Sequence, residues 1–280
     1  MNSGEWSDDP SENQGMRLGA TICSIVKNCK VVPELHLPML EKSAIDYVEI
    51  WPPTERREID VILRFFQKSR LRLWSLHAPF LNEELRRQAL AKIRRTIEIG
   101  GLLGARVIVL HPSYCSPTSE PIPDHERPKR IAQAKANLEE LVPVARRSNV
   151  ILALENLPRT CLGNSASELK LLLEDLPEDC VGICLDTNHV KKASSLPEII
   201  RELGSRIVTL HISDFDGVDE KHWLPGKGVI NWPAVWWALE DIGYSGPWLY
   251  EITAVYDDPK ANIRLIEENF QYLRSLAKRA

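Results

Sequence analysis

Short apolar, β-branched runs alternate along the chain with longer segments that have helical periodicity. This alternation is typical of βα units, in which each strand is followed by a helix that packs on the sheet. Eight runs predict strands, at residues 18–24, 45–50, 71–77, 107–111, 150–155, 181–186, 207–212 and 248–252. Helices are predicted between them, for example at residues 83–103, 128–147 and 232–242, with a last one at 259–280.

The predicted strands are hydrophobic on both faces, as in the run Val107-Ile108-Val109-Leu110. Strands of this kind occur in parallel sheets that helices cover on both sides. Eight such units predict an α/β fold, a single (β/α)8 TIM barrel that spans residues 16–280. A doubly wound open sheet is the alternative, but no G-x-G-x-x-G motif follows the first run. Residues 1–15, MNSGEWSDDPSENQG, are polar and rich in turn formers, and we expect a disordered N-terminal tail.

Composition narrows the class of protein. A chain of 280 residues with 44% hydrophobic content can bury one large core, and homo-oligomers are possible. The net charge of −4 argues against nucleic acid as a partner, and no apolar run approaches the roughly 18 to 20 residues that cross a bilayer. The six cysteines form no C-x-x-C pair, and no secretory segment precedes them, so we expect a reducing, cytoplasmic setting.

Four consecutive predicted strands end on a side chain that can bind a metal ion: Glu155, Asp186, His211 and Glu251. Each is about one strand-plus-helix unit from the next, so all four are expected at the same rim of the barrel. A single Glu or His after an apolar strand is ordinary, but four in consecutive units indicate a site. Two glutamates, one aspartate and one histidine form an oxygen-rich set that suits Mn²⁺, Zn²⁺, Co²⁺ or Mg²⁺.

Further polar side chains fall in matching places. His77 and His111 end two earlier predicted strands, His189 lies three residues after Asp186, and His222 lies in a long loop. We expect all four to line a substrate pocket, although a structural or supporting role stays open for His77 and His111. Lys227, in the run PGKG, is a candidate to attract a phosphate or carboxylate of the substrate, and the two glycines around it would let backbone approach the ligand.

Seven motifs carry a resemblance: LHAPF (76–80), LHPS (110–113), LENL (154–157), CLDTNH (184–189), LHISD (210–214), HWLPGKGVINW (222–232) and LYEI (249–252). In this order they resemble the sugar phosphate isomerase/epimerase group of the xylose-isomerase-like TIM barrel superfamily. The resemblance implies a divalent metal held by Glu155, Asp186, His211 and Glu251, with His189 orienting a small carbohydrate or its phosphate. It also implies that Glu155 and Glu251 act from opposite faces of the sugar.

The implied reaction is isomerisation or epimerisation. One glutamate removes the proton beside a carbonyl, the other returns it, and the metal stabilises the enediolate between the two steps. The chain departs from the ketose epimerases in one respect. Those enzymes tend to carry an arginine shortly before the proline-glycine element, where this chain has Lys221, His222 and Trp223.

Three alternatives remain open. A dehydratase of inositol-like or sugar-acid substrates would share the proton abstraction and then expel a β-hydroxyl. A sugar-binding protein without turnover is disfavoured, because the ligands and both candidate bases are intact. An abasic-site nuclease of the endonuclease IV type would bind three zinc ions, and the charge balance and the LPGKG element argue against it. Positions that resemble the nuclease ligands are His77, His111, Glu155, Asp186, His189, His211, His222 and Glu251, with Glu220 where an aspartate is usual.

Overall fold

The computed structural model describes residues 16–79, 86–113 and 122–277. The predicted tail at residues 1–15 lies outside these residues, as do the first residues of the helix predicted at 83–103 and the last three of the chain. The strands are β1 Leu18–Thr21, β2 Tyr47–Ile50, β3 Arg72–His77, β4 Val107–Leu110, β5 Ile151–Glu155, β6 Val181–Asp186, β7 Ile207–His211 and β8 Trp248–Tyr250.

All eight strands are parallel and belong to one sheet with the order β7-β6-β5-β4-β3-β2-β1-β8. The two edge strands meet through a parallel bridge between Ile212 and Tyr250. The backbone amide of Ile212 donates to Leu249, and that of Glu251 donates back to Ile212. The sheet therefore curls round into a nearly closed barrel, and the prediction of a single (β/α)8 TIM barrel is confirmed.

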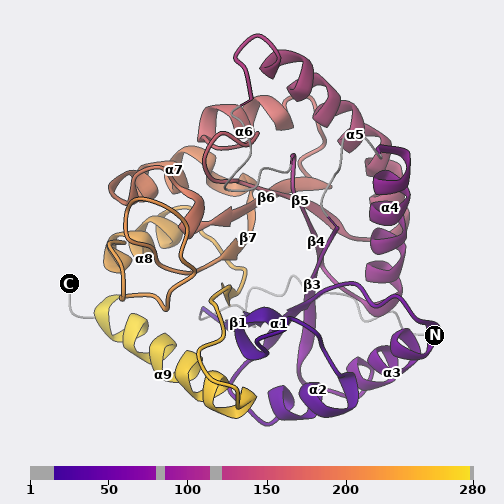
Figure 1. The fold of residues 1–280 in the computed structure, drawn as a ribbon, viewed down its shortest axis with the longest axis vertical. Helices are drawn as coiled ribbons and strands as arrows, with labels where there is room; N and C mark the ends of the chain where they lie inside the picture. The colour runs from indigo at the N-terminus through magenta and orange to yellow at the C-terminus, as the bar shows by residue number, and fades with distance from the viewer. Residues whose placement is uncertain (1–15, 80–85, 114–121, 278–280) are drawn as a thin grey trace.

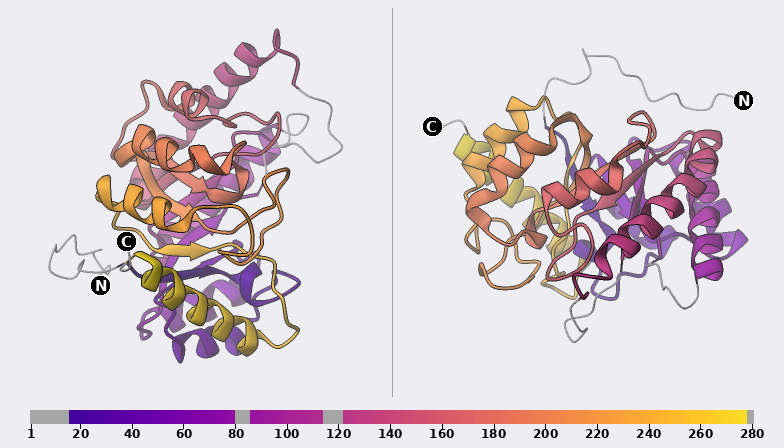
Figure 2. Two further views of the ribbon diagram at one scale, coloured as in Figure 1. Left: turned by 90° about the vertical axis from the view of Figure 1, so that its left-hand side faces the viewer. Right: turned by 90° about the horizontal axis from the view of Figure 1, so that it is seen from above.

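The helices form a layer around the strands, as Figure 1 shows. They are α1 Ile22–Ile25, α2 Pro33–Glu41, α3 Arg56–Phe66, α4 Arg86–Leu103, α5 Arg127–Ser148, α6 Ala166–Leu173, α7 Leu196–Leu203, α8 Trp232–Asp241 and α9 Pro259–Ala277. Helix α9 packs against both α8 and α2, so the end of the chain closes the ring beside its beginning (Figures 1 and 2). None of these described helices combines the length and the apolar character that a membrane span requires.

The first predicted strand is shorter than its hydrophobic run. Residues 22–24 were expected to continue the strand, but they begin helix α1. The side-chain oxygen of Thr21 accepts from the backbone amide of Ser24 and caps the helix. The Ser24 hydroxyl then donates to the carbonyl of Tyr250 and accepts from the amide of Ile252, which ties α1 to the strand that closes the barrel. Local capping therefore overrides the apolar pattern here.

The two-residue repeat of the strands decides which side chains face the barrel axis. Val107, Val109, Ala153 and Cys184 form a small buried cluster inside the barrel. The larger cluster, with residues such as Ile108 from β4, lies between the strands and the helices. Residues two positions beyond the inner cluster must face the same way, so Glu155 follows Ala153 and Asp186 follows Cys184 into the carboxyl-terminal mouth.

Candidate metal centre

The structure brings together the four side chains that end the later strands. Oxygen and nitrogen atoms of Glu155, Asp186, His211 and Glu251 all lie within 4.8 Å of one another. Glu155, Asp186 and His211 are the last residues of β5, β6 and β7, and Glu251 directly follows β8. The parallel register sets Asp186 beside His211, and the neighbouring pair is Glu155 with Cys184. We call these four residues the strand group.

His211 is fully buried and held in one orientation. Its Nε2 lies 3.2 Å from Oε2 of Glu49, to which the Ser75 hydroxyl also donates at 2.6 Å. Its Nδ1 lies 3.3 Å from Oε1 of Glu155 and 3.1 Å from Oε2 of Glu251. Burial lowers the pKa of His211, but without a cation the neighbouring carboxylates raise it overall, so both ring nitrogens carry protons. With a cation bound, the Nε2 proton would still be donated to Glu49, and the Nδ1 lone pair would face the cation. A carboxylate that orients a histidine from behind is a common feature of metal ligands.

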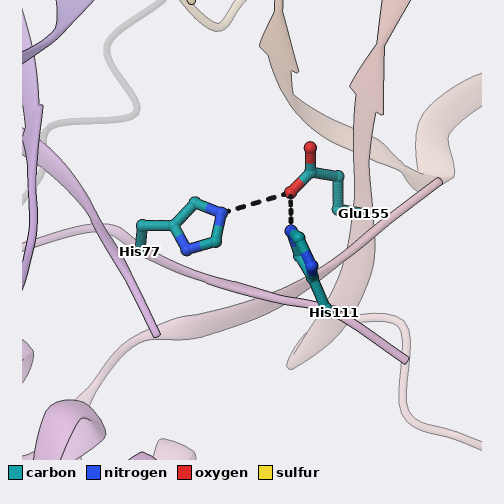
Figure 3. A group of neighbouring side chains, drawn as sticks. All are labelled: His77, His111 and Glu155. Carbon is teal, nitrogen blue, oxygen red and sulfur yellow. Dashed lines mark hydrogen bonds and ion pairs between the residues drawn. The ribbon is translucent and has the colours of Figure 1, made fainter. Parts of the chain in front are cut away.

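A second group contains His77, His111 and Glu155. As Figure 3 shows, both histidines approach the same oxygen, Oε2 of Glu155, at 3.3 Å for His77 and 2.9 Å for His111. Nδ1 of His77 lies 3.0 Å from the carbonyl of Ala78, and because a carbonyl only accepts, this nitrogen carries the proton. Glu155 therefore belongs to two groups at once, with one oxygen directed to each.

A third group, which we call the loop group, contains His189, Glu220 and His222. His189 lies in the short helical turn after β6, and the other two lie in the loop between β7 and α8. Nδ1 of His189 donates to the carbonyl of Asn156 at 2.9 Å, and Nδ1 of His222 donates to the carbonyl of Glu251 at 3.0 Å. In each ring, Nε2 is the nitrogen left for a ligand, and that of His189 lies 3.1 Å from Glu220.

The pKa values of the three carboxyl groups in the strand group reflect two opposing effects, burial and the nearby histidines. Burial alone would raise the pKa of Glu155, but His111 and His211 lower it well below its usual range. Burial would also raise the pKa of Glu251, and His211 instead holds it at about 2. The pKa of Asp186 rises to about 7, first because it is buried and further because Glu251 and Glu155 lie nearby. Glu155 and Glu251 are thus stabilised as anions by neighbouring imidazoles, whereas Asp186 is not stabilised enough to offset its burial.

These residues fit a divalent cation. Oδ2 of Asp186 is buried and accepts no hydrogen bond from the described residues. Its described contact is with Nδ1 of His189 at 3.3 Å. A buried carboxylate oxygen without a hydrogen bond is costly, and a metal ion is one of the few groups that would satisfy it. The donor set of three carboxylates and one oriented imidazole also matches the preferences of Mn²⁺, Mg²⁺, Co²⁺ and Zn²⁺.

Several residues of the site escaped the sequence-based prediction. Glu49 is an acid inside a strand that is buried along its whole length, and that position was the available signal. Asn156 links two strands: its side chain accepts from the amide of Asp186 at 2.6 Å and donates to the Asp186 carbonyl at 2.9 Å. Arg159, in the loop after β5, forms ion pairs with Glu220 and Asp219. No sequence motif distinguished this arginine.

The loop between β7 and α8 has its own internal support. The Asp214 carboxylate accepts from the amides of Gly226 and Ile230 and from the indole of Trp232. A side chain at Gly228 would collide with Asp214 and with the carbonyl of Phe215. Gly228 is therefore required by the close approach of two parts of the same loop, and an approach of its backbone to a ligand stays a prediction.

The predicted substrate-binding residues divide into two sets. His77, His111, His189 and His222 all lie in the three metal-capable groups. Lys227 is exposed on the β7–α8 loop, and its side chain makes no ion pair or hydrogen bond within the described part of the chain. Its role toward a phosphate or carboxylate stays a prediction.

Fold and site together define a TIM barrel with a candidate metal centre at the carboxyl ends of its strands. The chain belongs to the xylose isomerase-like TIM barrel family, whose model matches residues 39–276. The predicted superfamily is confirmed.

Three relatives give the range of sequence similarity. The chain is 30% identical over 186 residues to an uncharacterised protein of Methanocaldococcus jannaschii, with 61% of each protein covered. It is 31% identical over 118 residues to a D-psicose 3-epimerase of Enterocloster bolteae, covering 41% of this chain and 38% of that protein. A fructoselysine 3-epimerase of Shigella flexneri is 26% identical over 203 residues, 69% of each. The chain thus spans less than two thirds of the length of the first two relatives.

Two solved structures share the fold along nearly the whole chain. An L-ribulose 3-epimerase matches with a TM-score of 0.80 and 18% identity, covering 95% of this chain and 96% of its own. The IolI protein with a bound zinc atom matches with a TM-score of 0.79 and 21% identity, covering 93% and 98%. At these identities the likeness concerns the fold.

Proposed function

We propose that the protein is a divalent-metal-dependent isomerase or epimerase of a small sugar or sugar phosphate. The observation that carries the proposal is the strand group, in which Glu155 and Glu251 lie 3.3 and 3.1 Å from the same nitrogen of His211. The printed names of two relatives, D-psicose 3-epimerase and fructoselysine 3-epimerase, support the reaction class. The bound zinc atom named for IolI, which shares the fold, supports a divalent metal.

The strand group would hold the cation, and the cation would polarise a substrate carbonyl and so acidify the neighbouring carbon. The protein itself supplies the proton transfers. Glu155 and Glu251 have lowered pKa values, so both start as bases at neutral pH. They reach the mouth from β5 and from the end of β8, different sides of the ring. One glutamate would take the proton from the carbon beside the carbonyl. It would return that proton to the neighbouring carbon in an isomerisation, whereas an epimerisation would require the other glutamate to take up a proton from water before it donates to the opposite face.

His189 would contact a substrate hydroxyl, and His77, His111 and His222 would line the pocket. Hydrogen bonds to backbone carbonyls fix the rings of His77, His189 and His222, so the pocket would hold the substrate in one orientation.

A cytoplasmic location fits the five described cysteines, which are all free thiols.

A screen in deuterated water tests the proposal. The purified protein, reloaded with Mn²⁺, Co²⁺, Mg²⁺ or Zn²⁺, would be incubated with a panel of ketoses, aldoses and their phosphates, and NMR would follow deuterium at carbons next to carbonyls. We expect exchange with at least one substrate and its loss after chelation. Exchange followed by loss of water from the substrate would identify a dehydratase instead. No exchange with any sugar would overturn the proposal.

A second function is favoured by one specific observation. Nine side chains gather into three groups, two of which share Glu155, and these are the positions that resemble the ligands of abasic-site nucleases. An enzyme with three bound cations would be suited to phosphodiester hydrolysis. Incubation of the zinc-loaded protein with abasic duplex DNA decides between the two functions, since strand cleavage without exchange on any sugar would assign hydrolysis.

A further inference from the structure

We propose that Arg159 limits the number of cations that the mouth of the barrel holds, by occupying Glu220 and so keeping metal out of the loop group. This inference deepens the proposed metal-dependent function and rests on it. Arg159 lies outside every metal-capable group, so its contribution would be to set which of the available ligands are used.

Arg159 is held in place by its backbone. It has a positive φ of 56°, which residues other than glycine seldom adopt, and its carbonyl accepts from the side chain of Asn164 at 2.7 Å. Unusual backbone geometry that the surroundings maintain is common at functional sites. From this position the side chain reaches across from the β5–α6 loop to the β7–α8 loop. Its guanidinium lies 2.6 Å from Oε1 of Glu220 and 3.1 Å from Asp219.

The charges of the strand group and the loop group differ because of this contact. The strand group has three carboxylates, and the ion-pair partners described for Glu155, Asp186 and Glu251 are all histidines. The loop group has one carboxylate, Glu220, whose Oε1 pairs with the guanidinium of Arg159, which also contacts Asp219. A dication entering the loop group would meet a fixed positive charge on the far side of its single anionic ligand. The strand group should therefore bind metal first, and the loop group should stay without metal.

The consequence for the proposed reaction concerns His189. Its Nε2 lies 3.1 Å from Oε2 of Glu220, and in the absence of a cation there a substrate hydroxyl would reach this nitrogen by taking the place of Glu220. A third ion would bind the same nitrogen and remove that contact. Arg159 would thus act as a positioning residue that favours a sugar isomerase over an enzyme with a metal ion in every group.

Metal stoichiometry tests the proposal without any substrate. Stripped protein would be dialysed to equilibrium against a series of Zn²⁺ concentrations, and bound zinc per chain would be measured by mass spectrometry of the metal. We expect Arg159→Gln to bind one more ion per chain than the native protein. The Zn²⁺ concentration that fills the loop group should be at least tenfold lower in this variant than in the native protein. Arg159→Lys keeps the charge and should keep the native count. In the Arg159→Gln background, Glu220→Gln should remove the added ion.

Arg146→Gln is the matched control, since Arg146 also pairs with a carboxylate, Asp179, on an exposed part of α5. It should bind zinc as the native protein does. The proposal is overturned if folded Arg159→Gln binds the same number of ions as the native protein, or if the native protein already fills the loop group as tightly as the strand group. If Arg159→Gln fails to fold, Glu220→Gln in the native background decides, because loss of a bound ion there means that the native loop group holds metal and refutes the proposal, whereas an unchanged count supports an empty loop group.

The two proposals fail in different ways. Absence of exchange on every sugar would overturn the isomerase function and leave the zinc counts as they are. An unchanged zinc count in Arg159→Gln, together with exchange on a sugar, would overturn only the role of Arg159.

Discussion

The strand group and the loop group are built in different ways, although both consist of acids and histidines at the same mouth. Glu155, Asp186 and His211 end three adjacent strands and are at most 1% exposed, so ladder hydrogen bonds and register fix them. Glu220 and His222 lie in a loop, and the Glu220 side chain is 25% exposed. Arg159 pairs with the Glu220 side chain, and the backbone amide of His222 donates to the side chain of Asn188. The barrel itself thus fixes one group, and a few neighbours adjust the other.

The largest effect is expected for the strand group. Glu155→Gln should lower kcat/KM about 10³-fold, because it removes an anionic ligand and a base together, while the near-isosteric change retains the fold. Sugar turnover, bound metal and circular dichroism would be measured in parallel. Glu139→Gln, an exposed glutamate on α5, is the control and should change none of them. Full metal content and full turnover in Glu155→Gln would contradict the assigned role.

A support of the strand group should have the next largest effect. Glu49→Gln weakens the acceptor that orients His211, and we expect metal affinity to fall about 10- to 100-fold. Competition with a chelator would measure the affinity. Ser75→Ala, which removes only the hydroxyl that donates to Glu49, should have a smaller effect. Equal affinity in the native protein and in Glu49→Gln would show that the orientation of His211 does not depend on this carboxylate.

Metal affinity of the strand group should depend on pH. Burial raises the pKa of Asp186 to about 7, so below pH 7 a cation must displace a proton from this carboxylate. Affinity is expected to rise as pH increases through 7, by up to about tenfold per pH unit on the acidic side, and then to level off with respect to this group. Calorimetric titration at pH 6, 7 and 8 measures the trend. Constant affinity across this range would exclude a protonated Asp186.

The loop group should respond less. Glu220→Gln in the native background is expected to leave the metal count unchanged and to alter KM by less than about tenfold, since it weakens one hydrogen bond to His189 worth on the order of 1 kcal/mol. Steady-state kinetics and metal analysis are the measurements. Loss of a bound ion in this variant would mean that the native loop group holds metal and that the two groups do not differ in the way proposed.

The smallest effect is expected at Lys227. Because the side chain is exposed, Lys227→Gln should raise KM by about fivefold at most for a phosphorylated substrate and leave KM for the neutral sugar unchanged. Kinetics with a sugar and its phosphate would separate the two cases. The same change in KM for both substrates would argue against an anion contact.

The alternation of apolar runs with helical segments, and the regular spacing between strand ends, were enough to predict the barrel and the strand group. Glu155, Asp186, His211 and Glu251 were identifiable because each ends an apolar run, and the barrel topology then requires that they meet. Residues 22–24 were assigned wrongly, since a single hydrogen bond from Ser24 to Thr21 outweighs an apolar pattern that helix and strand share. Arg159 and Asn156 could not be assigned roles, because contacts between loops depend on the path of the backbone in three dimensions, which spacing along the chain does not reveal.

The Asp214 carboxylate gives the β7–α8 loop a fixed frame, as it binds the backbone at Gly226 and Ile230 and the ring of Trp232 at the start of α8. Exposed residues between Asp214 and Gly226 that lie outside the loop group, such as Lys221, can therefore be exchanged without loss of this frame. A library of substitutions at such positions, with Asp214, Glu220, His222 and Gly228 kept, would offer a route to new substrate preferences on an unchanged scaffold.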